Sequence, residues 1–550
     1  MIIDAHSVPE DTTIETDICI VGAGTAGLTL AKEFIGQHFR VCLIESGGLK
    51  PDRKTQALYQ GENIGRPYYS LDSARARYFG GTTNRWNIPI GDDCSGVRMR
   101  PLDAIDFEKR DWVPFSGWPF DKSHLDPYYD RAQKICKITP ATYDVPDWEN
   151  PEKTPSLPLN GDRVKTVIFK FGSRHPFLDT HAAEITQSEN ISTYLYANII
   201  DIETNETVHA VTRLHVACLE GNKFWVKANQ FILATGAIEI PRLLLSSNRI
   251  QKAGLGNQND LVGRFFMEHP HFSSGFFVPS APEVFKFACL YDHIHKVNEV
   301  PIIGKLSLSE KVLRQEKLLN YVVELSPRMA LKSALNQYLY PRIESKSVHS
   351  YQILRSAMAH RTLPDDAYKH FGNILSGLDD FTVTVYRNFK KRILRALDKR
   401  RIRLFRLDNM TEQVPNPESR VTLGSDLDSL GQRRVQLDWR LSNVDKESFI
   451  KSQEIVDQEL RRSGLGRLYI KPMHEIPRDQ ITGGWHHMGT TRMHTDPKYG
   501  VVDPNGRVHG ISNLFIAGPS VFPTSGYANP SLTIVALAVR LADHIKSILA

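Results

Sequence analysis

The chain has 550 residues, more than a single hydrophobic core usually supports, so we expect two domains. Its hydrophobic content of 41% and charged content of 24% are those of an ordinary globular protein. The formal net charge of +6 is small for this length and does not indicate a nucleic-acid partner. The six cysteines are scattered without a C-x-x-C pair, which predicts neither a metal site nor a disulfide framework.

The first residues, MIIDAHSVPEDTTIETD, are polar and acidic and lack the apolar core of a secretion signal. No stretch of about 20 uncharged apolar residues is present to span a bilayer. The nearest candidate, Ser531 to Ile548, is interrupted by Arg540, Asp543 and Lys546, which favours a core helix with a solvated end. Cytoplasm is the expected location.

Residues 16–48 predict a strand, a glycine turn, a helix and a second strand. The run Ile18 to Val21 is apolar throughout, as in a strand that is covered on both faces. Glycines at 22, 24 and 27 follow with G-x-G-x-x-G spacing, and a helix is expected from Ala26 to about Gln37. This arrangement predicts a dinucleotide site, with the pyrophosphate at the helix N-terminus.

A second apolar strand, Val41 to Ile44, ends in Glu45. An acidic side chain about 20 residues after the glycine turn can accept hydrogen bonds from an adenosine ribose, and it disfavours the 2′-phosphate of NADP. The glycine pattern alone does not separate NAD from FAD, and a purely structural glycine turn is the alternative interpretation.

Two further segments are candidates for contact with a planar ligand. Residues 77–86, RYFGGTTNRW, contain two glycines followed by small hydroxyl residues, although for this stretch alone we favour a plain turn. A buried strand from Phe231 to Ala234 enters the small turn Thr235-Gly236-Ala237, and a helix held at its start by Pro241 follows. This is again the geometry for close approach to a cofactor, with a generic strand-to-helix turn as the alternative.

The sequence pattern at the centre of the chain predicts structure and function less clearly. Residues 387–406 hold ten basic residues against one acid, Asp398. They fit either a surface for an anionic membrane or an acidic redox partner, or a solvated helix face, which we favour. Residues 421–423 and 435–439 predict half-buried strands around a turn, which would suit an antiparallel sheet in a second domain.

The C-terminal segment brings histidines, small residues and a helix start together. A short apolar strand from Leu514 to Ala517 precedes the turn Gly518-Pro519-Ser520, and Asn529-Pro530 opens a long apolar helix. Asparagine is a favoured N-cap and proline a favoured first-turn residue, so Asn529 has a purely structural interpretation. A helix N-terminus also stabilises negative charge, such as that of a reduced flavin.

At this point the chain resembles the glucose-methanol-choline (GMC) family of FAD-dependent oxidoreductases. The matching motifs are GAGTAG with Glu45, FGGTT, ATGAIEIPRLLLSSN, the H-x-x-G-T stretch, NLFIAGPS and ANPSLT. The HHMGTTRM form and the asparagine of ANP are most similar to the branch with pyranose oxidases and the large subunits of sugar and sugar-acid dehydrogenases. Residues 272–406 carry no matching motif.

The resemblance implies that His486, three positions before Gly489-Thr490, is the active-site histidine and that Asn529 takes the second active-site position. A histidine can take the hydroxyl proton, an amide can hydrogen-bond the developing alkoxide, and hydride passes to flavin N5. His487 is then expected to be a structural neighbour.

The resemblance also implies FAD as the cofactor, with no metal. Several relatives carry a histidine in the Gly-Gly loop that bonds covalently to flavin, and Arg85 in that stretch of this chain cannot form the bond, so we expect dissociable FAD. Arg85 is a candidate to add positive charge near the flavin or the substrate. The expected cofactor-binding residues are Gly22, Gly24, Thr25, Ala26, Gly27, Glu45, Ser46, Gly80, Gly81, Thr82, Thr83, Asn84, Thr235, Gly236, Gly518, Pro519, Asn529, Pro530 and Ser531.

The predicted fold is α/β: a Rossmann-like FAD-binding domain and a second α+β substrate domain built on an antiparallel sheet. Residues 12–100, 186–271 and 486–550 are assigned to the first domain, and 101–185 and 272–485 to the second. The predicted activity is oxidation of a CH–OH group of a sugar, glycoside or other polar alcohol. The alternatives are a different flavin reaction, such as a lyase or biosynthetic step, and a non-catalytic electron-transfer subunit. Oxygen, a quinone and a redox protein remain open as electron acceptor, as does a homo-oligomer.

Overall fold

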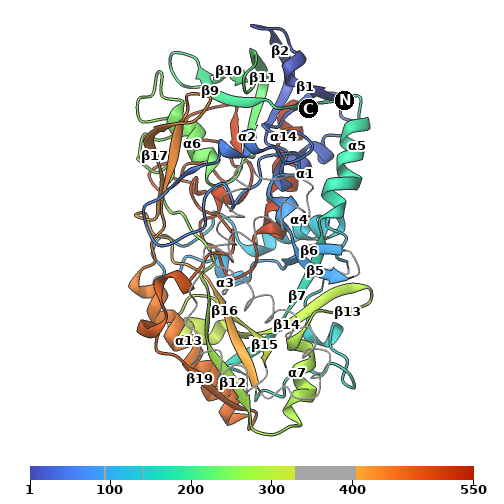
Figure 1. Cartoon of the computed structure of the whole chain (residues 1–550), viewed down its shortest axis with the longest axis vertical. Helices are drawn as coiled ribbons and strands as arrows, with labels where there is room; N and C mark the ends of the chain where they lie inside the picture. The colour runs from blue at the N-terminus through green and yellow to red at the C-terminus, as the bar shows by residue number, and fades with distance from the viewer. Residues whose placement is uncertain (92–93, 140–141, 161, 329–403) are drawn as a thin grey trace, which may run out of the picture.

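The computed structural model describes residues 1–91, 94–139, 142–160, 162–328 and 404–550. Two large sheets lie toward opposite ends of an elongated molecule, and both chain termini lie at the end that holds the first sheet (Figure 1). Each sheet has its own cluster of buried apolar side chains. The predicted α/β fold class is confirmed.

The first sheet has eight strands, in the order β1-β8-β3-β2-β11-β10-β9 with β20 beside β11. Its centre is parallel because β3, β2, β11 and β20 all run the same way, while β10 and β9 are antiparallel additions. The apolar runs predicted in β2 and β3 are buried on both faces. The strands are β1 (Ile2–Asp4), β2 (Thr13–Val21), β3 (Val41–Ile44), β8 (Ile191–Leu195), β9 (Asn198–Thr204), β10 (Val211–Ala217), β11 (Lys223–Leu233) and β20 (Leu514–Ile516).

Helix α14 (Ser531–Leu549) packs against α1 (Thr25–Glu33) and α4 (Lys122–Ile135). The first turns of α14 are buried and its last residues are exposed, as the interrupted apolar pattern predicted. Helix α1 is shorter than predicted: it ends at Glu33 because Gly36 takes a left-handed conformation, with φ of 72°.

The second sheet is antiparallel and has nine strands, in the order β19-β12-β16-β15-β14-β7-β6-β5 with β13 beside β14. Strands β5 and β6 belong to it although they lie inside the predicted segment 12–100, so the domain limits stay a prediction. The strands are β5 (Ile88–Gly91), β6 (Cys94–Met99), β7 (Val164–Ser173), β12 (His271–Pro279), β13 (His295–Val297), β14 (Val300–Leu308), β15 (Tyr321–Arg328), β16 (Leu404–Thr411) and β19 (Gly466–Ile470).

The strands predicted around 421–423 and 435–439 form an antiparallel pair, β17 (Arg420–Leu427) and β18 (Arg433–Asp438). They do not join the large antiparallel sheet. Instead β18 pairs with β4 (Gly61–Asn63), so these strands form a separate three-stranded sheet with a segment from near the N-terminus.

The remaining helices are α2 (Arg53–Ala57), α3 (Ala104–Phe107), α5 (Ala182–Gln187), α6 (Glu239–Ser246), α7 (Val284–Asp292), α8 (Glu310–Gln315) and α13 (Asn443–Arg462). Every helix within the described ranges is too short or too polar to cross a membrane. Of the basic segment 387–406, residues 387–403 lie outside the described part of the chain.

Candidate active site

Four parallel strands end side by side at one edge of the first sheet. Ile44, Val21, Leu233 and Ile516 are the last residues of β3, β2, β11 and β20, and they form one row across the sheet. Each strand is followed directly by a segment predicted to bind the cofactor. Parallel strands therefore bring the four segments together at their carboxyl ends, where ligands bind in α/β sheets.

The glycine turn after β2 is shaped by three different constraints. Gly22 has φ of 104°, a left-handed conformation. A side chain on Gly27 would begin 1.8 Å from the carbonyl oxygen of Gly22, so only glycine lets α1 approach the turn. Gly24 has no atom within 4 Å of the position of a side chain and faces open space. This open space, at the start of α1, is what a pyrophosphate requires.

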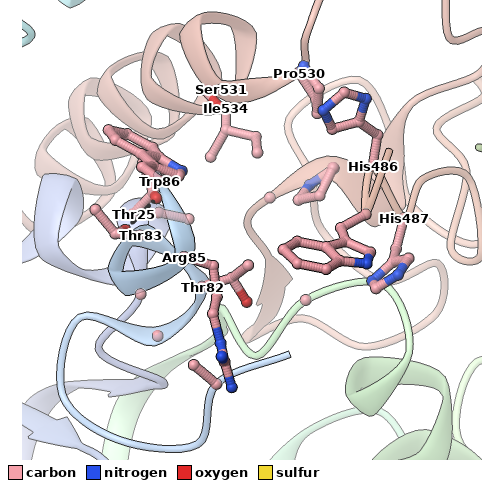
Figure 2. Close-up of a pocket in the computed structure, with 18 of the residues that line it drawn as sticks. Thr25, Thr82, Thr83, Arg85, Trp86, His486, His487, Pro530, Ser531 and Ile534 are labelled. Carbon is pink, nitrogen blue, oxygen red and sulfur yellow. Dashed lines mark hydrogen bonds between the residues drawn. The ribbon is translucent and has the colours of Figure 1, made fainter. Parts of the chain in front are cut away.

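The 3₁₀ turn Gly81–Arg85 forms the next wall of the same cavity. The Gly80 N–H donates to the carbonyl oxygen of Ala23 at 2.8 Å, and the hydroxyls of Thr25 and Thr83 are 2.8 Å apart. These contacts hold the second glycine loop against the first. Figure 2 shows the threonines on one side of the cavity and His486 on the other.

The cavity has a volume of about 370 Å³. Most of the predicted site residues line it: Gly22, Gly24, Thr25, Ala26, Glu45, Ser46, Gly81, Thr82, Thr83, Thr235, Gly236, His486, Gly518, Pro519, Asn529, Pro530 and Ser531. Gly27, Gly80 and Asn84 lie behind its wall. The Asn84 amide, for example, donates to the carbonyl oxygens of Phe79 and Gly81 and so supports the loop from behind.

Glu45 is buried at the edge of the cavity. One carboxylate oxygen accepts the N–H of Ala23 at 3.0 Å, and the other accepts the N–H of Gly47 at 2.9 Å. Burial raises the pKa of Glu45, and these backbone hydrogen bonds oppose the shift. The carboxylate thus ties β3 to the glycine turn and lies where an adenosine ribose is expected.

A buried ion cluster fixes the segment between Glu45 and the second glycine loop. Glu239 on α6 pairs with Arg75 at 3.1 Å and with Arg77 and Arg242 at 3.0 Å, and Arg242 also contacts Asp428 at 2.6 Å. Although burial opposes ionisation, the three guanidinium groups lower the pKa of Glu239 to about 2. The cluster joins α6 to the loop that enters the cavity wall.

His486 lies across the cavity from the glycine loops (Figure 2). Its Nε2 is 2.9 Å from Nδ2 of Asn529, and its Nδ1 is 2.8 Å from Nδ1 of His269. Burial and the neighbouring imidazoles hold the pKa of His486 well below its usual value. The structure therefore brings the two predicted catalytic side chains into direct contact.

Asn529 does not act as the cap of α14. The cap is Pro530, the helix begins at Ser531, and the Asn529 amide points to His486 instead. Within the described residues the Oδ1 atom of Asn529 is buried without a hydrogen-bond partner. Of the two interpretations of Asn529, the structural N-cap is wrong.

The backbone before His486 is held in an unusual conformation. Trp485 has φ of 61°, which is rare for a bulky residue. Fully buried Glu268 braces it by accepting the N–H groups of Gly484 and His486, each at 3.0 Å, and the hydroxyl of Tyr68. Burial raises the pKa of Glu268 to about 7, against the effect of these donors.

His487 also lines the cavity but points to Tyr68, whose hydroxyl is 2.8 Å from its Nε2. Burial lowers the pKa of His487 to about 3, so the ring is neutral at physiological pH. These contacts are consistent with the expected role of a structural neighbour.

Sequence reasoning missed several residues around His486. Glu268, His269 and His271 come from the run MEHPH, and Arg98 comes from β6. The dense spacing of acidic and imidazole groups in MEHPH was the available signal, but nothing in the sequence paired it with His486, 217 positions away. Arg98 had no comparable signal.

Three nitrogen atoms near His486 are buried without hydrogen-bond partners among the described residues. They are Nε1 of Trp485, Nε2 of His271 and Nε of Arg98. All three residues line the cavity. Buried polar atoms are usually satisfied, so these three are exceptions.

The residues present fit FAD. Gly24 leaves space for a close phosphate, and α1 and α14 both start at the cavity wall. The hydroxyl of Thr235, at the end of β11, is buried without a partner in the described structure. The cavity therefore has two helix N-termini on its wall, as a bound dinucleotide requires.

Comparison with known proteins agrees with this assignment. Residues 415–538 match the family model described as GMC oxidoreductase. The chain is 24% identical to the fructose dehydrogenase large subunit of Gluconobacter japonicus over 97% of this chain and 98% of that one. It is 38% identical to a C-glycoside 3-oxidase of Microbacterium trichothecenolyticum over 22% of this chain and 23% of that one.

Solved structures support the fold. A formate oxidase superposes with a TM-score of 0.54 at 17% identity, covering 98% of this chain and 99% of that one. A fungal aryl-alcohol oxidase superposes with a TM-score of 0.54 at 16% identity, covering 99% of this chain and 100% of that one.

Fold, cavity and comparisons together define an FAD-dependent oxidoreductase. More particularly, residues 415–538 match the GMC oxidoreductase family model and the whole chain is similar to the large subunit of fructose dehydrogenase, which supports the resemblance to GMC flavoenzymes that the motifs predicted.

Proposed function

We propose that this enzyme oxidises a CH–OH group of a sugar, glycoside or other polar alcohol, with His486 as the base. The contact between His486 Nε2 and the Asn529 amide, on the wall of the cofactor cavity, carries the proposal. When bound, FAD supplies the acceptor for the hydride that leaves the substrate carbon.

His486 and Asn529 have complementary roles. Because its pKa is lowered, His486 is neutral at physiological pH and can take the substrate hydroxyl proton at Nε2. The Asn529 amide can donate a hydrogen bond to the same oxygen as negative charge develops on it. A bound hydroxyl would therefore replace the direct contact between the two side chains.

Two observations support a polar substrate. The cavity wall near His486 is built from polar side chains, since Trp485, His271 and Arg98 all line it. Similar proteins include enzymes named for fructose and C-glycoside oxidation. A sugar presents several hydroxyl groups at close spacing, which suits a wall of polar side chains.

We further propose that FAD is dissociable. Arg85 lines the cavity in the loop where several relatives carry a flavin-linking histidine, and a guanidinium does not form that bond. Heat denaturation is expected to release yellow flavin into the supernatant. Colour that stays with the precipitated protein would contradict this expectation.

The proposed domain division keeps residues 12–100, 186–271 and 486–550 with FAD and 101–185 and 272–485 with the substrate. Strands β5 and β6 are the part of the first group that pairs with the second sheet. They carry Arg98 over the cavity and so connect the two parts.

The test is an anaerobic panel with D-fructose, D-glucose, a methyl glucoside and benzyl alcohol as donors. We expect at least one sugar to bleach the flavin absorbance of the wild type and not that of His486→Gln. Repeating turnover with oxygen and with an artificial dye identifies the acceptor class. Bound flavin that no donor reduces would contradict the proposal and favour a different flavin reaction.

A further inference from the structure

Two buried imidazoles and one buried segment, residues 525–529, are joined by a chain of hydrogen bonds. His269 Nε2 lies 3.2 Å from the carbonyl oxygen of Ser525, and His269 Nδ1 lies 2.8 Å from Nδ1 of His486. His486 Nε2 then meets the Asn529 amide at 2.9 Å. We propose that His269 is a positioning residue that fixes the tautomer of His486 and leaves its Nε2 free to accept a proton. This inference rests on the proposed role of His486 as the base.

The direction of donation along the hydrogen-bond chain follows from its first contact, between Ser525 and His269. A carbonyl oxygen only accepts hydrogen bonds, so the contact with Ser525 requires a hydrogen on Nε2 of His269. A neutral imidazole carries one ring hydrogen, so Nδ1 of His269 has a lone pair and accepts.

The tautomer of His486 follows in turn. Because Nδ1 of His269 accepts, the hydrogen between the two rings belongs to Nδ1 of His486. Nε2 of His486 is then the unprotonated nitrogen, and it accepts from Nδ2 of Asn529. Each of the three contacts has one donor and one acceptor, so the whole chain runs in one direction.

The hydrogen-bond chain requires a neutral His269. The residue is fully buried, and burial lowers its pKa to about 4. The ionisable groups that influence the two rings are Glu412 beside His269, and His271, His487 and Arg98 around His486. Glu268 contacts this region through the backbone N–H groups of His269 and His486. Within the described residues no carboxylate contacts a ring nitrogen of His269 or His486, and burial lowers the pKa of both, so both rings are neutral near pH 7.

Both ends of this hydrogen-bond chain come from one segment of the polypeptide. Ser525 and Asn529 lie four positions apart between the turn η7 (Pro519–Val521) and α14, and they bracket the two imidazoles. A ring held at both ends cannot rotate to exchange its nitrogens without breaking two hydrogen bonds. When Nε2 of His486 gains a proton, the two contacts that join Ser525, His269 and His486 remain possible, since Nδ1 of His486 keeps its hydrogen and its acceptor. The contact with Nδ2 of Asn529 is then lost, because both nitrogens are donors.

Three substitutions at position 269 distinguish the contribution of Nδ1 of His269 from that of Nε2. The amide oxygen of His269→Asn occupies nearly the position of Nδ1 and can still accept from His486. His269→Gln reaches instead toward the position of Nε2 and Ser525, and His269→Leu has no polar atom. We expect the asparagine variant to retain the tautomer and the other two to lose it.

The first measurement is a two-bond ¹⁵N–¹H correlation spectrum of the histidine-labelled holoenzyme, with the His486 signals assigned from His486→Gln. In the wild type and in His269→Asn, Nδ1 of His486 should be protonated and Nε2 unprotonated. In His269→Leu and His269→Gln we expect the Nε2-protonated form or a mixture. A wild-type spectrum with the hydrogen on Nε2 of His486 would overturn the proposal, whatever the variants do.

The second measurement is flavin reduction by the best donor of the substrate panel, followed as a function of pH. We expect His269→Leu to slow reduction by about 10- to 100-fold and His269→Asn to recover most of the loss. The flavin absorbance spectrum serves as the control for folding and cofactor binding. Equal rates and an unshifted pH profile in the leucine variant would overturn the positioning role. A correct tautomer without any reducible donor would instead refute the proposed function alone.

Discussion

The two sides of the cavity are built in different ways. The side that follows β2 is made of backbone: glycines at positions 22, 24 and 27 set its shape, and their spacing is contained in six residues. The opposite side is made of side chains from distant segments, since His269, His486 and Asn529 meet only in the folded chain. The first side suits a dinucleotide, whereas the second side holds the residues that we propose to be catalytic.

This difference predicts two kinds of failure. A change in the glycine turn should affect folding and cofactor binding, whereas a change in the imidazole chain should leave a yellow, folded protein that reacts slowly. The predictions below test that separation, from the largest expected effect to the smallest.

The largest effect is expected from His486→Gln. Loss of the proposed base should slow flavin reduction by about 100- to 10,000-fold, while the flavin spectrum persists. Stopped-flow absorbance under anaerobic conditions measures both. His487→Gln is the matched control, because His487 points to Tyr68 and not to Asn529. We expect a much smaller loss in the control, and similar losses in both variants would contradict the assignment.

Asn529 should come next. Replacement by alanine removes the amide that faces His486 Nε2, and loss of such a donor typically costs about 100- to 1,000-fold in rate. Asn529→His restores a donor and should recover part of the rate, whereas Asn529→Asp should not, since a carboxylate only accepts. Full activity of the alanine variant in single-turnover flavin reduction would show that the amide is dispensable.

Much of this arrangement could be predicted from the sequence, because the relevant signals are local. Apolar runs such as Ile18 to Val21 predicted the central strands, and the glycine spacing predicted the turn between β2 and α1. Each of the four segments that follow these strands was predicted separately to bind the cofactor. Parallel pairing of the strands places the four segments together.

Other features depend on tertiary contacts that leave no local pattern. The pairing of β18 with β4 joins residues about 370 positions apart, and its sequence signal is that of any half-buried hairpin. Likewise, His269 resembles an ordinary core histidine until the fold places it beside His486. The interpretation of Asn529 as an N-cap failed because Pro530 takes the cap and frees its side chain.

On the backbone side, Gly27→Ala is expected to lower the free energy of unfolding by about 1–3 kcal/mol or more, because the new methyl group would start 1.8 Å from a carbonyl oxygen. Gly24→Ala is the matched control, since nothing lies within 4 Å of its side-chain position. We expect the control to fold normally but to bind FAD more weakly. Denaturant unfolding and quenching of FAD fluorescence distinguish the two, and equal stability losses would contradict this account of the turn.

The smallest effect concerns pH. The pKa of His487 is about 3 in the folded protein and about 6.5 when unfolded. The unfolded state therefore binds one more proton at this position below pH 6.5, and folding stability is lost as the pH falls. His487→Gln should remove this dependence, so its stability relative to wild type should rise by about 1.4 kcal/mol per pH unit between about pH 6 and 4. If the denaturant midpoints of wild type and His487→Gln shift by the same amount as the pH falls, the prediction is contradicted.

The most direct test of the central claim is a crystal structure of the holoenzyme at a resolution that places the flavin ring. The account predicts the adenosine end beside Glu45, the pyrophosphate at Gly24 and the flavin ring on the side of His486 and Asn529. Flavin density outside this cavity, or a flavin ring that His486 does not face, would contradict it.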